Sequence, residues 1–388
     1  MNINFKSLFI KSTIFIYIIY LLWYTQAIGH SNIFLYGGII LVFIFFLNYI
    51  NGKRFNDFKV SKRLLYWFFY GIYSLIFGLI VAVDKVYLIT SLSTYFAFLF
   101  LCISIFIISS MEKDSDWIIN YLMIVCLFCA LYTIFNGYDY YNGVMVITMG
   151  PNNNPNTLGA LMVFGMFSVM YKEKKRIYQL LASLVVLLLF FYIIIISGSK
   201  KALLSGLIFI LIWGIGFTKY IRNKNLNYKL ITMIILIITL TIFVYYFSSL
   251  YINTSSFERL TGLRSSGSTN IRIGMYKESL FLFKNNPLIG IGYNQFRFLS
   301  FFETYSHSTY AELLSGGGII GTLLFLTPII STGINLIKNR TKLPAYNHWL
   351  YIAIYCVEVF LGTVNIIMYS FMHLLMWTII YVYVEIES

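Results

Sequence analysis

Long apolar runs follow one another along almost the whole chain, separated by short segments rich in charges, Pro, Gly, Asn or Ser. An α-helix needs about 20 apolar residues to cross the roughly 30 Å hydrocarbon core of a bilayer. We therefore expect an all-α polytopic membrane protein, with residues 1–388 forming one transmembrane domain. The pattern predicts twelve spans, near residues 8–27, 33–50, 64–83, 87–109, 117–136, 157–171, 177–196, 202–218, 230–250, 309–336, 346–363 and 365–384.

Composition excludes an ordinary soluble domain. The chain is 59% hydrophobic and only 11% charged, whereas charged residues make up about a quarter of a typical soluble protein. The net charge of +14 would suggest nucleic acid in a soluble protein, but in a polytopic protein cations mainly set orientation by lying in cytoplasmic loops. We expect the lipid bilayer as a partner and no nucleic acid. All four cysteines fall inside apolar runs, which indicates no disulfide framework.

Basic residues predict an orientation with both termini in the cytoplasm. Alternating the loops from a cytoplasmic N-terminus places 19 of the 28 cations inside. Six of the nine others lie in one long outer loop, residues 251–308, between the ninth and tenth spans. Within it, residues 271–284 mix apolar and charged positions and predict a helix on the membrane surface. The outer cations are Lys85, Lys200, Lys201, Arg259, Arg264, Arg272, Lys277, Lys284 and Arg297.

Three helices that start on the outer side have polar starts. They follow the segments 151–156, 197–201 and 306–308. Helix N-termini carry unpaired N–H groups and the positive end of the helix dipole, so they favour anions. Lys200 and Lys201 at one such start predict a diphosphate site; the alternative is that they anchor a helix end at the interface.

A few residues near these starts could carry a proton. His307 could accept one from a hydroxyl at neutral pH, although a single loop histidine is often incidental. Glu303 and Glu312 are alternatives as base or orienting group. His373, within the last span, could be functional or could only form a packing hydrogen bond. The C-x-x-C formed by residues 126–129 lacks further ligands, so we expect no metal.

Five short segments occur in a recognisable order. They are GPNNNPN (150–156), SKKALL (199–204), NIRIGMY (270–276), NPLIGIG (286–292), and His307-Ser308 followed after nine residues by GIIGT (318–322). Together they resemble the O-antigen polymerase and ligase superfamily of bacterial cell-envelope glycan assembly, over roughly residues 140–340. The resemblance implies transfer of a glycan from a polyprenyl diphosphate to an acceptor hydroxyl at the outer face of the bacterial inner membrane, with no cofactor.

The resemblance also implies roles for particular residues. By motif position, Arg272 would bind the diphosphate and His307 would activate the acceptor. Lys200 stands where the family has an arginine, and lysine lacks the planar fork that binds two oxygens at once, so Lys200 and Lys201 could share the task. The further candidates are Arg264 as a diphosphate ligand and Asn156 and Glu312 as supporting residues.

The expected function is a metal-independent polymerase that joins lipid-linked repeat units of O-antigen or capsular polysaccharide. The alternative is an O-antigen ligase that passes finished chains to lipid A-core. Expected partners are the polyprenyl-diphosphate-linked donor and the glycan acceptor, with a chain-length regulator and a flippase as further candidates. A flippase or transporter is the rival from another class, and it would place its key charges near the bilayer midplane.

Overall fold

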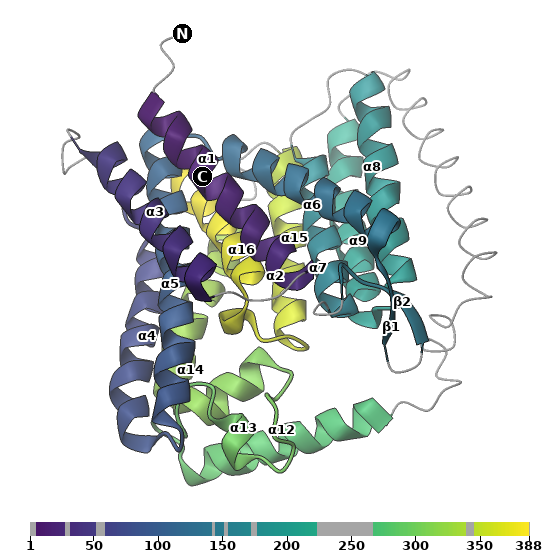
Figure 1. Ribbon diagram of the computed structural model, residues 1–388. Helices are drawn as coiled ribbons and strands as arrows, with labels where there is room; N and C mark the ends of the chain where they lie inside the picture. The colour runs from purple at the N-terminus through teal and green to yellow at the C-terminus, as the bar shows by residue number, and fades with distance from the viewer. Residues whose placement is uncertain are drawn as a thin grey trace.

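The computed structural model describes residues 5–27, 32–51, 59–141, 144–150, 154–171, 177–222, 267–338 and 345–387. In these ranges the protein is a helical bundle with one two-stranded antiparallel hairpin (Figure 1). The helices are α1 (Phe5–Ile19), η1 (Tyr20–Tyr24), α2 (Thr25–Ala27), α3 (Asn32–Ile50), α4 (Lys62–Val81), α5 (Lys85–Glu112), α6 (Asp116–Asn136), α7 (Pro155–Met170), α8 (Ile177–Ile196), α9 (Lys200–Arg222), α12 (Gly267–Asn285), α13 (Phe296–Leu299), α14 (Thr309–Lys338), α15 (Ala345–Gly362), η3 (Ile367–Tyr369), α16 (Phe371–Val382) and η4 (Tyr383–Glu387); the strands are β1 (Tyr138–Tyr141) and β2 (Val144–Ile147).

Several of these helices could cross a membrane. Within the described residues, eight are long and apolar enough, and two shorter apolar helices accompany them: Pro155–Met170 and Phe371–Ile386. The predicted ninth span, 230–250, lies outside the described residues. The eight are Phe5–Ala27, Ile33–Ile50, Lys62–Val81, Lys85–Glu112, Asp116–Asn136, Tyr178–Ile196, Lys200–Thr218 and Thr309–Lys338.

The expected all-α class is correct except for the β1–β2 hairpin, which the apolar pattern did not predict. Its four-residue strands pair from Tyr138 opposite Ile147 to Tyr141 opposite Val144.

Two helices differ from typical membrane spans, which expose an apolar surface to lipid. The short helix α7 is buried on nearly every side, which fits its apolar sequence all round. Helix α15 carries His348 and Glu358, both fully buried, so these two side chains face the bundle interior.

Helix α14 is broken at Gly318, whose φ of 60° and ψ of −163° are not helical. The preceding segment Pro287–Gly292 fills the break, because Ile291 N–H donates to Ser315 O (2.8 Å) and Ile319 N–H donates to Pro287 O (2.9 Å). A Cβ on Gly318 would lie 2.4 Å from Leu288 O, so only glycine fits there. Gly290 and Gly318 therefore allow the backbone of segment Pro287–Gly292 to approach the backbone of α14 at its break.

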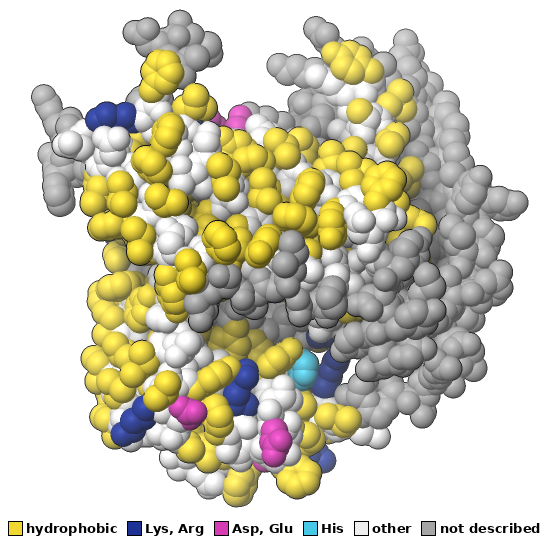
Figure 2. Space-filling view, in the orientation of Figure 1, with side chains coloured by type: hydrophobic (Ala, Val, Ile, Leu, Met, Phe, Trp, Pro, Cys, Tyr) yellow, Lys and Arg dark blue, Asp and Glu magenta, His cyan; other side chains and the backbone are white. Residues whose placement is uncertain are grey.

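Helix α12 crosses one end of the bundle at a steep angle to α4 and α5 (Figure 1). It covers the segment for which a surface helix was predicted and begins four residues earlier, at Gly267. In the view of Figure 2, charged side chains gather on this end, whereas apolar side chains cover most of the body of the bundle above it.

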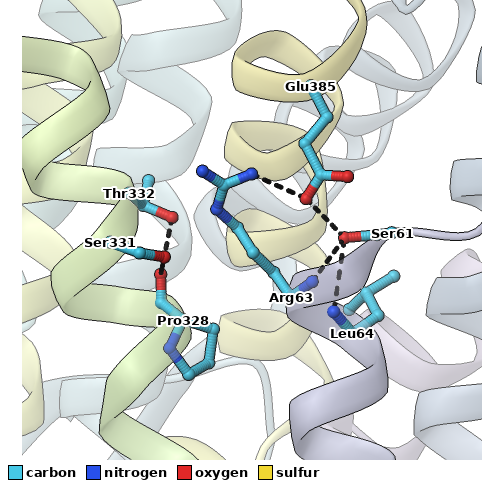
Figure 3. Close-up of polar contacts among 7 residues, drawn as sticks. All are labelled: Ser61, Arg63, Leu64, Pro328, Ser331, Thr332 and Glu385. Carbon is cyan, nitrogen blue, oxygen red and sulfur yellow. Dashed lines mark hydrogen bonds and ion pairs between the residues drawn. The ribbon is translucent and has the colours of Figure 1, made fainter. Parts of the chain in front are cut away.

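Two partly buried ion pairs lie at the opposite end of the bundle. Arg63, at the start of α4, donates from Nη1 to Glu385 Oε1 at 2.7 Å, and Ser61 Oγ donates to the same oxygen at 2.7 Å (Figure 3). Lys11 of α1 pairs with Glu112, the last residue of α5. The first pair joins the start of α4 to η4, and the second joins α1 to the end of α5.

Candidate active site

A cavity of about 400 Å³ opens at the α12 end of the bundle. Its walls come from the starts of α7 and α9, from α12, from the loop before α14, and from the connection between α15 and α16. The residues that line it are Asn154, Asn156, Thr157, Lys201, Ile271, Arg272, Met275, Tyr305, His307, Asn365, Ile366, Tyr369, Ser370, Met372 and His373.

The starts of α7 and α9 are joined by side-chain hydrogen bonds. Asn154 caps α7 by accepting from the Asn156 backbone N–H at 2.9 Å. Asn156 Oδ1 accepts from Ser199 Oγ at 2.8 Å, and Ser199 Oγ caps α9 by accepting from the Ala202 N–H at 3.2 Å. A Cβ on Gly159 would lie 2.4 Å from Ala202 Cβ, which shows how closely the two helices approach. Asn156 therefore fixes the start of α9 as well as lining the cavity.

The two adjacent lysines at the start of α9 point in different directions. Lys201 is half-buried and lines the cavity, where its Nζ donates to Val364 O and to Asn365 Oδ1, the latter at 3.2 Å. Lys200 is exposed and is not among the lining residues. Consecutive residues on a helix are about 100° apart, so only one of them can face the cavity. The structure therefore brings Lys201, and not Lys200, to the other predicted site residues.

Arg272 reaches the cavity from α12, which is attached to the bundle by polar contacts. Ser279 Oγ donates to Ala311 O at 2.6 Å. Glu278 accepts from Ser300 Oγ and from the Phe301 N–H, both at 2.8 Å. These bonds lie one to two turns from Arg272 and fix the part of the helix that carries it.

A buried carboxylate fixes the loop that carries His307. Glu312 Oε2 accepts from the Ser306 N–H at 2.9 Å, and its other oxygen accepts from Tyr369 OH at 3.0 Å. His307 adopts a left-handed backbone conformation with φ of 58°. Its ring lies against Tyr305 with the ring centroids 4.4 Å apart. Glu312 does not line the cavity, but it orients the backbone beside His307 and a tyrosine that does.

The surroundings of His307 favour a neutral imidazole. Burial lowers its pKa from 6.5 to about 4, and the positive charges of Lys201 and Arg272 add to the shift. At pH 7 the ring therefore has a free nitrogen that can accept a proton. An anion bound between the cations would oppose their effect and raise the pKa of His307 again.

Other predicted residues lie elsewhere. Arg264 lies outside the described residues. Glu303 is exposed and does not line the cavity. Among the residues that the structure describes, no group of three or more His, Cys, Asp or Glu is placed to hold a metal ion.

One comparison with known proteins bears on this site. Residues 184–326 match the family described as O-antigen ligase. The match confirms the predicted resemblance to the O-antigen polymerase and ligase superfamily. It includes Lys201, Arg272, His307 and Glu312, and it ends before the α15–α16 connection. No curated protein matches the chain.

Sequence reasoning missed the α15–α16 connection, which supplies Asn365, Tyr369 and Ser370 to the cavity. This segment is far from the other site residues in sequence, and its residues form no motif. A weak signal was available, because Glu358 and His373 interrupt the apolar spans on either side of the connection. Ionisable residues inside membrane spans are energetically costly and therefore often mark functional positions.

Proposed function

We propose that this protein is a glycosyltransferase that moves a glycan from a polyprenyl diphosphate to the hydroxyl of an acceptor sugar. The observation that carries the proposal is the cavity itself. It gathers two basic side chains, Lys201 and Arg272, and a neutral imidazole, His307, from three segments that are far apart in sequence. All three residues lie inside the segment that matches the O-antigen ligase family.

The proposed reaction needs little beyond charge neutralisation and one base. The bond between the anomeric carbon and the diphosphate oxygen breaks, and a bond from that carbon to the acceptor oxygen forms. Lys201 and Arg272 stabilise the negative charge that develops on the departing diphosphate. His307 takes the hydroxyl proton and later releases it to water. The chemistry needs no metal, because the two side-chain cations supply the positive charge.

A second cavity, of about 480 Å³, supports a lipid-linked donor. It shares Thr157, Tyr369, Ser370 and Met372 with the first cavity, so the two are adjacent. Its other walls include Leu21, Leu22, Leu35, Phe98 and Leu161. We assign the diphosphate to the first cavity and the start of the polyprenyl tail to this neighbour, whose lining residues include no charged side chain.

We place the cavity end at the outer face of the bacterial inner membrane, with both termini in the cytoplasm and twelve spans in all. The basic starts of α1 and α4 lie at the opposite end, where Lys11 and Arg63 form their ion pairs. An excess of Lys and Arg favours the cytoplasmic side. The surface helix α12 and the loop after it would then lie outside, within the predicted outer segment 251–308.

The acceptor decides between two activities of this class. We propose a polymerase, whose acceptor is a second lipid-linked repeat unit of O-antigen or capsular polysaccharide. The description of the matched family favours the alternative, a ligase whose acceptor is lipid A-core. The position of the cations at one end of the bundle argues against a flippase or transporter, since such proteins bind their cargo near the midplane.

Deletion of the gene tests the choice when the surface glycan is run on a sizing gel. A polymerase predicts that long chains disappear while single repeat units still reach the final acceptor. A ligase predicts that full-length chains accumulate on the polyprenyl carrier, with none on the final acceptor. An unchanged glycan pattern would contradict both activities.

A further inference from the structure

Four polar side chains form a chain that runs from Lys201 in the cavity wall to Glu358 in the core. Lys201 Nζ donates to Asn365 Oδ1 at 3.2 Å. Asn365 Nδ2 lies 3.4 Å from His373 Nε2. His373 Nδ1 lies 3.1 and 3.2 Å from the two carboxylate oxygens of Glu358. The four residues come from α9, from the α15–α16 connection, from α16 and from α15, so only the folded bundle brings them together.

The inner pair is deeply buried. Glu358 is 0% exposed and His373 is 2% exposed. The His373 ring also packs edge-on against Phe164. Replacement of both partners of a buried hydrogen bond by apolar groups of the same shape can be nearly neutral, so core packing alone gives little reason for this pair. The connection of this pair to Lys201 through Asn365 gives a better reason for its presence.

The hydrogen bonds of the chain all have the same direction. Lys201 Nζ donates to Asn365 Oδ1, so the other end of the amide, Nδ2, donates to His373 Nε2. With Nε2 accepting, the proton of the His373 ring lies on Nδ1, which donates to the carboxyl group of Glu358. The opposite tautomer of His373 would turn the Asn365 amide round and place an NH₂ group against the ammonium of Lys201. This tautomer is assigned from the hydrogen-bond network.

We propose that Glu358, His373 and Asn365 are positioning residues that hold the ammonium of Lys201 at the cavity wall. The inference rests on the proposed function, in which that ammonium binds the donor diphosphate. Lysine has a flexible four-carbon stem and lacks the rigid fork of arginine, so its neighbours must supply its orientation.

A double-mutant cycle on diphosphate binding tests the proposal. The full-length protein in lipid nanodiscs is titrated with farnesyl diphosphate, a short soluble polyprenyl diphosphate, by calorimetry. We expect Glu358→Gln to weaken binding about tenfold and Lys201→Met to weaken it at least as much. The double variant should bind no more weakly than Lys201→Met alone, because the chain acts only through Lys201.

Two further variants separate positioning from a structural role. Asn365→Ala removes the acceptor next to Lys201 and leaves the buried pair intact, so it should also weaken binding even if Glu358→Gln fails to fold. His348→Gln is the matched control, because His348 is equally buried but contacts Tyr383 instead of the chain. We expect this control to bind farnesyl diphosphate like the wild type. Glu358→Asp keeps the charge and should recover part of the affinity.

The proposal is overturned if the wild type does not bind the diphosphate, if Glu358→Gln and Asn365→Ala both bind normally, or if Glu358→Gln and Lys201→Met weaken binding independently. These results are separate from the test of the proposed function. The double-mutant cycle could give the expected result while deletion of the gene leaves the glycan unchanged. That combination would support the positioning role of Glu358, His373 and Asn365 and refute the proposed glycosyltransferase activity.

Discussion

At the scale of single residues, the site depends on one histidine that the fold keeps uncharged. Burial and two nearby cations lower the pKa of His307 to about 4. A general base must be unprotonated at the working pH. The same cations that would bind the diphosphate also keep His307 unprotonated. Substitution of His307 by alanine should therefore reduce turnover about 10²- to 10⁴-fold and leave farnesyl diphosphate binding intact. A radiolabelled-donor turnover assay measures this reduction.

The pH dependence of kcat/KM follows from the same arrangement. Acid should abolish activity as the pH falls through about 4, because protonation of His307 removes the base. Arg272→Met removes a positive charge that disfavours the imidazolium, so the acid limb should move to higher pH. Lys277→Met, on the exposed side of the same helix, should leave the limb in place. An unmoved limb in Arg272→Met would show that Arg272 does not act on the base.

Two adjacent lysines provide a matched comparison. Lys201 faces the cavity and Lys200 is exposed. A hydrogen bond to a charged group contributes roughly 1.5–3 kcal/mol, so Lys201→Met should lower kcat/KM about 10- to 100-fold. Lys200→Met should change it less than about twofold, since exposed charges contribute little. Equal losses in both variants would mean that both lysines bind the donor.

At the scale of the elements, the apolar pattern was sufficient for the helices but not for their interruptions. The predicted spans 64–83 and 87–109 correspond to α4 and α5 within a few residues. The break in α14 was not predicted, because it depends on hydrogen bonds to the distant segment Pro287–Gly292. The long apolar run of residues 309–336 carries no sign of it except its glycines.

The broken helix makes a clear stability prediction. Gly318→Ala would place a Cβ 2.4 Å from Leu288 O in a backbone conformation that suits only glycine. Strain of this kind costs about 1–3 kcal/mol, so the melting temperature in nanodiscs should fall. Gly214→Ala is the control, because nothing lies within 4 Å of its added Cβ. Alanine is favoured over glycine in a helix by about 1 kcal/mol, so this control should be as stable as the wild type or more stable.

At the scale of the whole molecule, the sequence indicated which residues share one end, but it could not indicate which of them meet. Alternating topology placed Asn156, Lys201, Arg272 and His307 on one side, and the structure gathers all four around one cavity. It could not separate Lys201 from Lys200, which depends on how α9 is rotated in the bundle. The sequence also could not identify Asn365 as a site residue, because its contact with Lys201 of α9 forms only in the folded protein.

The proposed orientation can be tested by labelling single introduced cysteines with a membrane-impermeant maleimide on intact spheroplasts. Glu303→Cys lies near the cavity end and Lys62→Cys at the opposite end, and both positions are exposed. We expect only Glu303→Cys to react. Background should be low, because three native cysteines are buried and Cys356 is partly buried. Reaction at Lys62→Cys alone would place the cavity in the cytoplasm and exclude a donor site at the outer face.

The central claim is that glycan transfer takes place in this cavity. Its most direct test is turnover of a purified polyprenyl-diphosphate-linked repeat unit by the protein in nanodiscs, with the products sized on a gel. We predict a ladder of longer glycans and released polyprenyl diphosphate with the wild type and with Lys200→Met. His307→Ala should give no ladder within the reaction time of the wild type, because its turnover is expected to be about 10²- to 10⁴-fold lower. A full ladder from His307→Ala would contradict the account, because transfer would then not depend on the base that the cavity supplies.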